Sequence, residues 1–348
     1  MADQPTSGRR PTMLDVAARA GVSKSLVSLV MRGEPPVRED KRRRVLAAAE
    51  ELGYRLNSAA RSLSAVRSGT VGVLLADWRN PALTDVVETA GQVLEAAGLS
   101  VLITSAVLPA AAGELDTAAI GTLRDLRVEG VLVVGSVPHR EALARILHGL
   151  PVVTASAGAE ALSCDVVRTD DTIGMGLLVD HLVDQGHTRI AHLGGRGGAV
   201  AEGRLRGYRD AMRERGLADE CLLAEADFTE ESGYRGMSRL LCTGNPTAVV
   251  ALNDLAALGA MSAAADHGLR IPADLALTGY DDSFVAAIRQ ISLTSINPDS
   301  GGIGASAAVC LIERIGGDPA PPSELLLPPT LVVRASSAAR IDTEAVTR

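Results

Sequence analysis

The stretch TMLDVAARAGVSKSLVSLVMR, from Thr12 to Arg32, predicts two short helices joined by a tight turn at Gly21. Thr12 is placed to cap the first helix, because Asp15 three residues later completes a Thr-x-x-acid pattern that satisfies free amide groups at a helix start. Gly21 suits a left-handed turn at the end of that helix, and Ser23 can cap the next one. The pair predicts a helix-turn-helix, whose second helix can enter the DNA major groove. The alternative is an ordinary Gly-linked helix pair in a small helical domain.

Apolar residues recur in both helices at a spacing that predicts one buried face on each. In the first helix Val16 and Ala20 share a face, and the small alanine lets a second helix approach closely. In the second helix Leu26, Val27 and Val30 are predicted to point inward. The residues left on the outer side are Lys24, Ser25, Ser28, Leu29 and Arg32.

A third helix is predicted from about Arg38 to Leu52, after the helix-breaking segment Gly33-Glu34-Pro35-Pro36. The residues predicted to close a small core from this helix are Val45, Leu46, Ala49 and Leu52. Its basic run from Lys41 to Arg44 is either a solvated helix face or a set of phosphate contacts.

Length and charge restrict the class of protein. The 348 residues suffice for two or three domains. The first 68 residues hold 13 Lys and Arg against 7 Asp and Glu, a net charge of +6, so the other 280 residues carry −14 of the total of −8. A basic segment on an acidic chain predicts nucleic-acid binding at one end. The polar start lacks a signal-peptide core, and no apolar stretch approaches a membrane span, so we expect a cytoplasmic protein without membrane contact.

From Thr70 the sequence changes to apolar runs of strand length, which are separated by stretches of mostly helical period. The runs are TVGVLLA, VLITSA, GVLVVGS, LPVVTAS, RIAHLGG, TAVVALN and LALTGY. Alternating strands and helices predict parallel sheets in an α/β fold. Ligands of such sheets bind beyond the carboxyl ends of the strands, which is where the sequence places polar side chains.

A catalytic or metal site has little support. The cysteines, which lack metal-ligand or redox spacing and are interpreted as reduced core residues, are Cys164, Cys221, Cys242 and Cys310. The histidines that need not converge, because they lie on different predicted elements, are His181, His187 and His192. The run GGRGG at 194–198 lacks the spacing of a phosphate-binding loop. We therefore expect no enzyme, no cofactor and no metal.

The run LDVAARAGVS, followed by EELGYRLN and SAARSL, resembles the amino-terminal headpiece of the lactose-repressor (LacI/GalR) family of bacterial transcription regulators. Asp15 to Ser23 follow the D-V-A-x-x-A-G-V-S core of that family, and the segment from Leu52 to Asn57 follows its Leu-Gly-Tyr-x-Pro-Asn pattern. The family's T-V-S-R appears here as Leu26-Val27-Ser28-Leu29. Leucine cannot donate to a guanine edge but can contact a thymine methyl group, so the expected half-site differs from the common one.

The resemblance implies a helix-turn-helix headpiece followed by a two-subdomain body with parallel sheets that is similar to periplasmic binding proteins. The implied divisions are a disordered tail at 1–11, a headpiece at 12–56, a hinge helix and linker at 57–68, a body at 69–335 and a tail at 336–348. Within the body, the subdomain near DNA spans about 69–168 plus 300–326, and the far one about 169–299 plus 327–335.

The resemblance also implies a DNA surface. Lys24 and Ser25 match the base-reading positions, whereas Ser23 and Ser28 are better placed to contact phosphates. In the hinge, Leu63 matches a leucine that wedges into the minor groove; its place between the headpiece and the linker favours this role over the alternative of an ordinary core residue. The full DNA-binding set is Thr12, Ser23, Lys24, Ser25, Ser28, Leu29, Arg32, Asn57, Ala60 and Leu63.

An effector site is implied where family members bind sugar hydroxyls or other small-molecule groups. Its residues are Asp77, Trp78, Asn80, Asp171, Arg204, Phe228, Asn253, Tyr280 and Asp281. Trp78 and Phe228 are either aromatic platforms for a ring or packing residues. The family's Phe-Phe pair after Asn-Pro is Ala82-Leu83 here, and a family aspartate appears as Ser156.

These features predict a homodimeric regulator that binds a pseudo-palindromic operator in double-stranded DNA. The favoured function is repression of a carbohydrate operon, with release by a small effector, most simply a sugar. The alternatives are a corepressor-dependent regulator that responds to a nucleobase or a phosphorylated metabolite, and a solute-binding protein. The tail from Ser336 lacks leucine heptads, so a dimer is expected rather than a tetramer.

Overall fold

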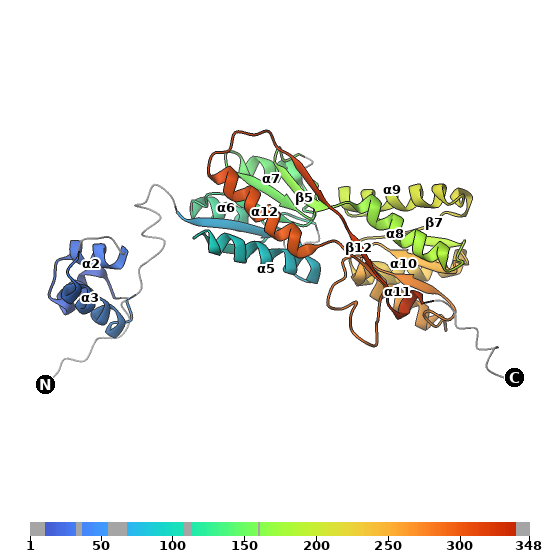
Figure 1. Ribbon diagram of the computed structural model, residues 1–348, viewed down its shortest axis with the longest axis horizontal. Coiled ribbons are helices and arrows are strands. Elements are labelled where there is room, and N and C mark those ends of the chain that lie inside the picture. Colours follow the sequence, from blue (N-terminus) through green and yellow to red (C-terminus); the bar gives the residue numbers. More distant parts are fainter. Residues whose placement is uncertain (1–10, 33–36, 55–67, 108–112, 159–160, 339–348) are drawn as a thin grey trace. The chain divides into compact units, whose positions relative to one another are not determined.

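The computed structural model describes residues 11–32, 37–54, 68–107, 113–158 and 161–338. The chain divides into two compact units, residues 1–68 and 69–348, which we call the headpiece and the body. The predicted tail at 1–11, except its last residue, and the predicted hinge residues Asn57, Ala60 and Leu63 lie outside the described residues. Figure 1 shows the elements of each unit.

The headpiece contains α1 (Met13–Ala20), α2 (Lys24–Arg32) and α3 (Glu39–Glu51). The predicted capping box is present, because the Thr12 hydroxyl accepts from the Asp15 amide at 3.4 Å and the Thr12 amide donates to the Asp15 carboxylate at 2.7 Å. Gly21 takes the left-handed conformation, with φ 61°, that ends α1. These local contacts set the turn that presents α2.

Eight apolar residues close the headpiece core: Val16, Ala17, Ala20, Val27, Val30, Val45, Ala48 and Ala49. The prediction for Leu46 is wrong, because its side chain is 45% exposed and Ala48 is buried instead. Residues 45, 48, 49 and 52 share one face of a helix with a 3.6-residue period, and residue 46 lies about 100° away from it. Arg44, from the predicted basic run, donates to the Ala20 carbonyl at 2.5 Å and so holds α3 against the end of α1.

The first lobe of the body has a six-stranded parallel sheet in the order β11-β5-β4-β3-β1-β2. Its strands are β1 (Thr70–Leu75), β2 (Ser100–Ser105), β3 (Val131–Val134), β4 (Val152–Ala155), β5 (Asp165–Thr169) and β11 (Glu324–Leu327). Helices α5 (Pro81–Ala96) and α12 (Ser300–Ile315) share one apolar core with the sheet, and α6 (Thr117–Asp125) and α7 (Arg140–Leu147) share another. The sheet is therefore covered on both faces.

The second lobe has a four-stranded parallel sheet in the order β7-β6-β8-β9. Its strands are β6 (Ile190–Gly195), β7 (Leu222–Ala226), β8 (Ala248–Ala251) and β9 (Ala276–Thr278). Helices α8 (Asp171–Asp184) and α9 (Ala199–Glu214) contribute to one core, and α10 (Glu230–Thr243) and α11 (Asp254–Asp266) to the other. A short 3-10 turn, η1 (Ala218–Glu220), follows α9.

Three segments connect the lobes. The first runs from β5 into α8 at Asp170, the second from β10 (Ser295–Asn297) into α12, and the third from β11 into β12 (Thr330–Val332). β10 and β12 pair antiparallel, so two of the three connections form a ribbon, which is visible between the lobes in Figure 1. This topology is the predicted two-subdomain α/β body.

The predicted start of the tail at residue 336 is wrong. The turn η2 (Ala335–Ser337) packs on the second lobe, where Ser336 and Ser337 are 2% and 1% exposed. The Ser336 hydroxyl donates to the Leu277 carbonyl at 2.6 Å, and the Ser337 hydroxyl donates to the Thr294 hydroxyl at the same distance. The body therefore extends at least to Ser337.

Two further observations concern the sequence-based expectations. Cys164 is buried, but Cys242 is exposed on α10, so the interpretation of all four cysteines as core residues is wrong for Cys242. Within the described residues, no helix combines the length and the apolar character needed to cross a membrane.

Candidate functional site

A cavity of about 880 Å³ lies between the two lobes of the body. It is lined by residues that follow the carboxyl ends of the strands in both sheets, and by the first turns of the helices that come next. A cleft at this edge of a parallel sheet is the usual ligand site of the architecture. Six of the nine residues predicted for the effector site line it, namely Asp77, Asn80, Asp171, Arg204, Phe228 and Asp281.

The other three predicted effector residues do not line the cavity, and each has a different position. Trp78 is 50% exposed on the surface. Asn253 is fully buried, where its side chain accepts from the Ala256 amide at 2.9 Å to cap α11 and donates to the Phe228 carbonyl at 3.2 Å. Tyr280 is also fully buried, with its ring 3.6 Å from the Arg204 guanidinium carbon. Asn253 and Tyr280 therefore support the wall from behind.

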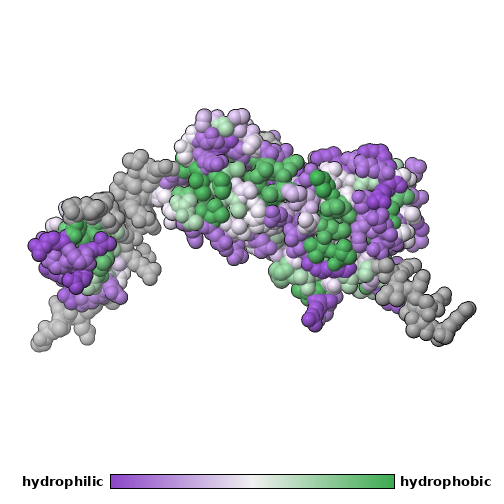
Figure 2. Space-filling model, viewed as in Figure 1, coloured by the Kyte–Doolittle hydropathy of each residue, from purple (hydrophilic) through white to green (hydrophobic). Residues whose placement is uncertain are grey.

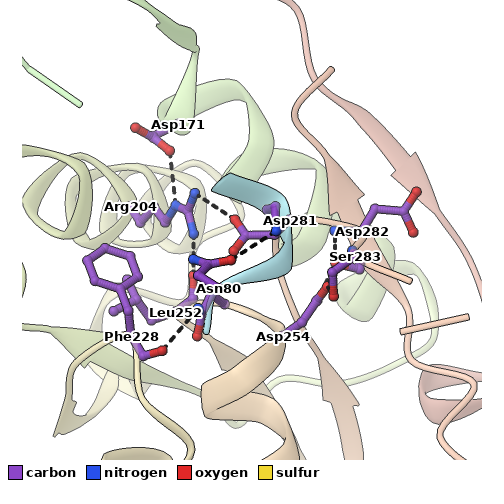
Figure 3. A network of polar contacts seen from close by, with 12 residues as sticks. Asn80, Asp171, Arg204, Phe228, Leu252, Asp254, Asp281, Asp282 and Ser283 are labelled. Carbon is purple, nitrogen blue, oxygen red and sulfur yellow. Dashed lines mark hydrogen bonds and ion pairs between the residues drawn. The ribbon is translucent and has the colours of Figure 1, made fainter. Parts of the chain in front are cut away.

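Arg204 is the centre of the polar wall (Figure 3). Its Nε donates to Asp171 at 3.0 Å, one terminal nitrogen to the Leu252 carbonyl at 2.6 Å, and the other to Asp281 at 3.2 Å. The side chain is 6% exposed, so these contacts replace water around a buried charge. Through these contacts the Arg204 side chain, on α9, joins three other segments of the second lobe.

Asp281 faces the cavity from a strained backbone, with φ 104° in a region that L residues rarely adopt. Burial raises the pKa of its carboxyl group, while Arg204 and a hydrogen bond from Asn80 act in the opposite direction. Asn80 belongs to the first lobe, where its side-chain oxygen caps α5 by accepting from the Ala82 amide at 3.0 Å. The Asn80 amide thus links the two lobes at the edge of the cavity.

Behind Asp281 lies a second acid, Asp254, which is 1% exposed. Its carboxylate accepts from the Ser283 amide and hydroxyl, both at 2.8 Å, and from the Ser295 hydroxyl at 2.6 Å. Burial, followed by the charge of Asp281, raises the pKa of Asp254 to about 7. Ser295 begins β10, so this acid connects the cavity wall to one of the segments that cross between the lobes.

Asp282 continues the connection, because it also has a left-handed backbone, with φ 45°. Its carboxylate accepts from Asn297 of β10 at 3.0 Å and forms an ion pair with Arg334 at 2.7 Å. The two consecutive aspartates therefore have different roles: Asp281 borders the cavity, and Asp282 contacts Asn297 of β10 and Arg334, beside the ribbon formed by β10 and β12.

Sequence reasoning missed Arg168, which lines the cavity from β5. It donates to Asp171 at 3.1 Å and to Glu324 of β11 at 2.7 Å, and so keeps Asp171 between two guanidinium groups. The available signal was an arginine directly after Val166-Val167 and shortly before Asp170-Asp171, since a charge at a buried strand needs a partner. Ser136 and Ser156 also line the cavity, and Ser156 has a left-handed backbone.

The three histidines considered as a metal site have separate partners. His181 contacts the Ser337 hydroxyl at 2.8 Å, and His187 contacts the Thr247 hydroxyl at 3.0 Å. His192 lies in β6, where burial lowers its pKa to about 4. The described residues contain no group of three or more side chains that could hold a metal ion.

In the headpiece, Ser23, Lys24 and Ser25 are exposed at the start of α2, whereas Ser28 and Leu29 are half-buried. The Ser23 hydroxyl caps α2 by accepting from the Leu26 amide at 3.2 Å. Thr12 is engaged in its own capping box. Arg32 is the last residue of α2, and its side chain lies outside the described atoms.

Comparison with protein families gives two matches. Residues 12–57 match the family model "Bacterial regulatory proteins, lacI family". Residues 179–337 match the model "Periplasmic binding protein-like domain". The first match covers the three helices of the headpiece, and the second covers most of the second lobe, two of the three crossing segments, and α12 and β11 of the first lobe.

Among curated proteins, the chain is 32% identical over 339 residues to the HTH-type transcriptional regulator MalR of Streptomyces coelicolor, covering 94% of this chain and 96% of that protein. It is 34% identical over 340 residues to the regulator CelR of Thermobifida fusca, covering 94% and 98%. Among solved structures, the lac repressor dimer bound to operator and the anti-inducer ONPF aligns with a TM-score of 0.82 and 28% identity, covering 95% of this chain and 100% of that one.

Proposed function

This chain belongs to the lacI family of bacterial regulatory proteins, and we propose on that premise that it is a homodimeric repressor of a carbohydrate operon. It is a DNA-binding transcriptional regulator and not an enzyme. In the proposal it acts in the cytoplasm, binds a pseudo-palindromic operator and leaves it when a sugar occupies the cavity. The observation that carries the proposal is the cavity between the lobes, with the Arg204 network in its wall, on a chain that also has the headpiece.

The proposed DNA surface is the exposed first turn of α2. Lys24 and Ser25 are the direct readers of base edges, because they are exposed and belong to the second helix of the motif. Ser23 and Ser28 contact phosphates and set the register, with Thr12 and Arg32 beside them. Leu29 contacts a thymine methyl group, and its partial burial limits it to that short reach.

The hinge at 57–68, which lies almost entirely outside the described residues, completes the proposed DNA surface. We assign Asn57, Ala60 and Leu63 to the minor groove, with Leu63 as a wedge at a central base step. Such a wedge unstacks two base pairs at a cost of a few kcal/mol, which added protein contacts offset.

A sugar is the proposed effector because the cavity wall offers carboxylates and side-chain oxygens to hydroxyl groups. Solved relatives have bound sugars: one is a CelR–cellobiose complex, 31% identical with a TM-score of 0.69, covering 94% of this chain and 100% of that one. Asp77, Asn80 and Asp281 are the proposed hydroxyl partners. Phe228, which packs over Gly197, is the proposed platform for the apolar face of the sugar ring.

The proposed homodimer would cover apolar side chains that the body exposes. Figure 2 shows apolar areas on both lobes. Leu102 and Ile103, on the edge strand β2, are 37% and 46% exposed, and Phe284 in the second lobe is 69% exposed. An exposed apolar edge strand favours association, and two-fold symmetry of the dimer implies a two-fold related operator.

The proposed coupling between cavity and DNA is thermodynamic. A sugar that binds one arrangement of the two lobes more tightly shifts the population toward that arrangement. The crossing ribbon is the connection available for this shift, because Asp254 and Asp282 attach β10 to the wall of the cavity. The released arrangement would disfavour the paired hinge segments.

The test begins with selection of operator sequences by the full-length protein from random DNA. We expect two half-sites related by two-fold symmetry. Lys24→Ala should then relax preference at one position per half-site and cost on the order of 1–3 kcal/mol per contact. Lys41→Ala on α3 is the control, because a lysine outside the recognition helix should not change the preference for any base: it weakens all sequences alike and lowers the salt dependence if Lys41 contacts a phosphate, and changes neither if Lys41 lies on a solvated face. If Lys24→Ala weakened binding to all sequences equally, Lys24 would contact a phosphate and not a base. Selection of sites without two-fold symmetry would contradict the dimer.

A further inference from the structure

The second crossing segment of the body, from β10 into α12, passes along the wall of the cavity, where Pro298 and Ser300 line it. At its start the segment is bound to the second lobe, because the Ser295 hydroxyl donates to Asp254 at 2.6 Å and accepts from the Asp282 amide at 3.0 Å. From Ser300 onward it belongs to the first lobe, where α12 packs into the core beneath the sheet. The change of lobe therefore occurs between residues 295 and 300.

Asn297 lies in this interval and is bonded in both directions. Its side-chain nitrogen donates to the Asp282 carboxylate of the second lobe at 3.0 Å, and its side-chain oxygen accepts from the Asp299 amide at 2.8 Å. A carboxylate can accept but not donate, and a backbone amide can donate but not accept, so this orientation of the Asn297 side chain satisfies both partners. Asp299 is the N-cap of α12, where its carboxylate accepts from the Gly302 amide at 3.0 Å. One side chain thus connects a turn of the second lobe to the cap of a first-lobe helix.

Both ends of this connection have a left-handed backbone, which residues other than glycine rarely adopt. Asp282 has φ 45° and directly follows Asp281, which has φ 104°. Asp299 has φ 59°. Such conformations cost on the order of 1–3 kcal/mol each and persist where surrounding contacts hold them. The two hydrogen bonds of Asn297 are among those contacts, so a change at one end alters what holds the other.

The start of α12 is packed tightly against α5 of the first lobe. A β-carbon on Gly304 would lie 2.3 Å from the Val86 carbonyl oxygen and 3.1 Å from the Ala90 amide nitrogen, both on α5. Backbone packed against backbone leaves no side chain between the helices that could rearrange, and packed interiors transmit displacement. A shift at the start of α12 is therefore passed to α5.

We infer that Asn297 is a positioning residue that carries a displacement of the turn at Asp281 and Asp282 to the start of α12. This inference rests on the proposed function and names the connection through which a ligand in the cavity changes the first lobe. A ligand that contacts Asp281 moves Asp282, because the two are consecutive in one turn. Asp282 then moves the Asn297 side chain, and the cap at Asp299 follows.

Because contiguity does not by itself establish coupling, the experiment measures whether a change at Asp282 reaches α12 through Asn297. Hydrogen exchange of the full-length protein without ligand is followed by mass spectrometry in peptides that cover residues 299–306. Asp282→Ala should speed exchange in these peptides by about three-fold or more, the size expected when a helix cap is lost. Asn297→Ala should have the same effect. The double variant should exchange no faster than Asn297→Ala alone.

Asp180→Ala is the matched control, because Asp180 is another second-lobe aspartate with an arginine partner, Arg215 at 2.6 Å, but it lies on the surface of α8. It should leave exchange at the start of α12 unchanged. Asp282→Gly removes the same carboxylate and suits the left-handed backbone, so it takes the place of Asp282→Ala if that variant does not fold.

Three results would overturn the inference. The first is unchanged exchange at the start of α12 with Asp282→Ala. The second is an additive increase in the double variant, because Asp282 would then act on α12 by a route that does not include Asn297. The third is an equal increase with Asp180→Ala, because the second lobe would then be destabilised in general. Each result would leave the sugar-responsive repressor in place, since neither sugar nor DNA enters the measurement, and selection of asymmetric operators would contradict the repressor and not this connection.

Discussion

The buried residues that the structure describes in the headpiece are all apolar, whereas the body buries charged side chains in the wall of its cavity. The described ion pairs of the headpiece are on the surface: in the shorter one, Arg19 with Glu51 at 2.6 Å, both side chains are 55% exposed, and Arg38 pairs with Asp40 at 3.2 Å. In the body, Arg204 and Asp171 form their pair at 6% and 2% exposure. The headpiece therefore depends on local caps and a small apolar core, and the body adds long-range contacts between buried charges to its larger apolar cores.

Because of this difference, removal of one partner of an ion pair should destabilise the body more than the headpiece. Exposed ion pairs contribute little to stability, because water already solvates both partners. A buried pair gains little over an apolar pair of the same shape, but removal of one partner leaves an uncompensated charge away from water. The body therefore has a buried ion-pair network, sensitive to loss of a single side chain, in the wall of its cavity, and the headpiece has no comparable network among its described residues.

The largest expected effect comes from Arg204→Ala. Its removal leaves Asp171 and Asp281 without their guanidinium partner, and we expect a loss of about 3–5 kcal/mol in the free energy of unfolding of the body. The headpiece should keep its stability. Hydrogen exchange followed by mass spectrometry reports both units in the full chain: peptides of the body should exchange faster, and those from α1 to α3 should not change.

Arg215→Ala provides the control, because Arg215 also contacts two aspartates, Asp180 and Asp184, at 2.6 and 3.0 Å, but on the surface. We expect a much smaller change than for Arg204→Ala. Equal losses from the two variants would show that burial of the network does not determine its contribution. Faster exchange in α1 to α3 would show that the units are not independent.

The second prediction concerns pH and Asp254, whose pKa is raised to about 7 by burial and by the charge of Asp281. The folded body binds the proton of the Asp254 carboxyl group more tightly than the unfolded chain does. The resulting contribution to the free energy of unfolding is therefore complete at low pH. It is lost as pH rises from about 4 to about 7, with a slope of at most about 1.4 kcal/mol per pH unit. We expect chemical denaturation of the body between pH 5 and 7.5 to show this loss, and Asp254→Asn to remove it.

His192 changes the free energy of unfolding with pH in the opposite direction. Burial lowers its pKa to about 4, so protonation below about pH 6.5 favours the unfolded chain. The difference between wild type and Asp254→Asn at each pH cancels this contribution. The headpiece, whose described core holds no carboxyl or imidazole group, should not follow the Asp254 profile. A pH-independent difference between the two proteins would contradict the raised pKa.

The sequence also predicts the structure of the headpiece more completely than that of the body. In the headpiece, Thr12, Asp15 and Gly21 determine caps and turns within a few residues, so the helices and the turn follow from the local pattern. The prediction for Leu46 was wrong because all four residues considered for the core are apolar, so apolar character alone did not separate the buried ones from the exposed one. In the body, the seven predicted apolar runs correspond to β1, β2, β3, β4, β6, β8 and β9, whereas β5, β7, β10, β11 and β12 were not predicted. The partners of Arg204 could not be predicted, since they lie 33, 48 and 77 residues away along the chain.

The site residues illustrate the same limit. Arg204 and Asp281 were predicted from the resemblance to the family, and Asp281 also because it follows a predicted strand; both line the cavity. Asn253 and Tyr280 have the same kind of position, but their side chains point into the packing behind the wall, where one caps α11 and the other lies against Arg204. Strand ends indicate which residues are near a cleft, and the direction of each side chain depends on contacts that spacing does not encode.

The smallest predicted effect is local to the headpiece. Thr12→Ala removes the hydroxyl contacts of the capping box, in which the Thr12 hydroxyl contacts the Asp15 carboxylate at 2.7 Å, but keeps the backbone amide that also donates to Asp15; it should cost about 1 kcal/mol. Exchange should become faster in α1 and in the helices packed on it, while the body peptides remain unchanged. Thr12→Ser retains the hydroxyl and should retain the stability. If Thr12→Ala destabilised the body as well, or if Thr12→Ser lost as much as Thr12→Ala, the stability of the headpiece would depend on more than its local caps and its apolar core.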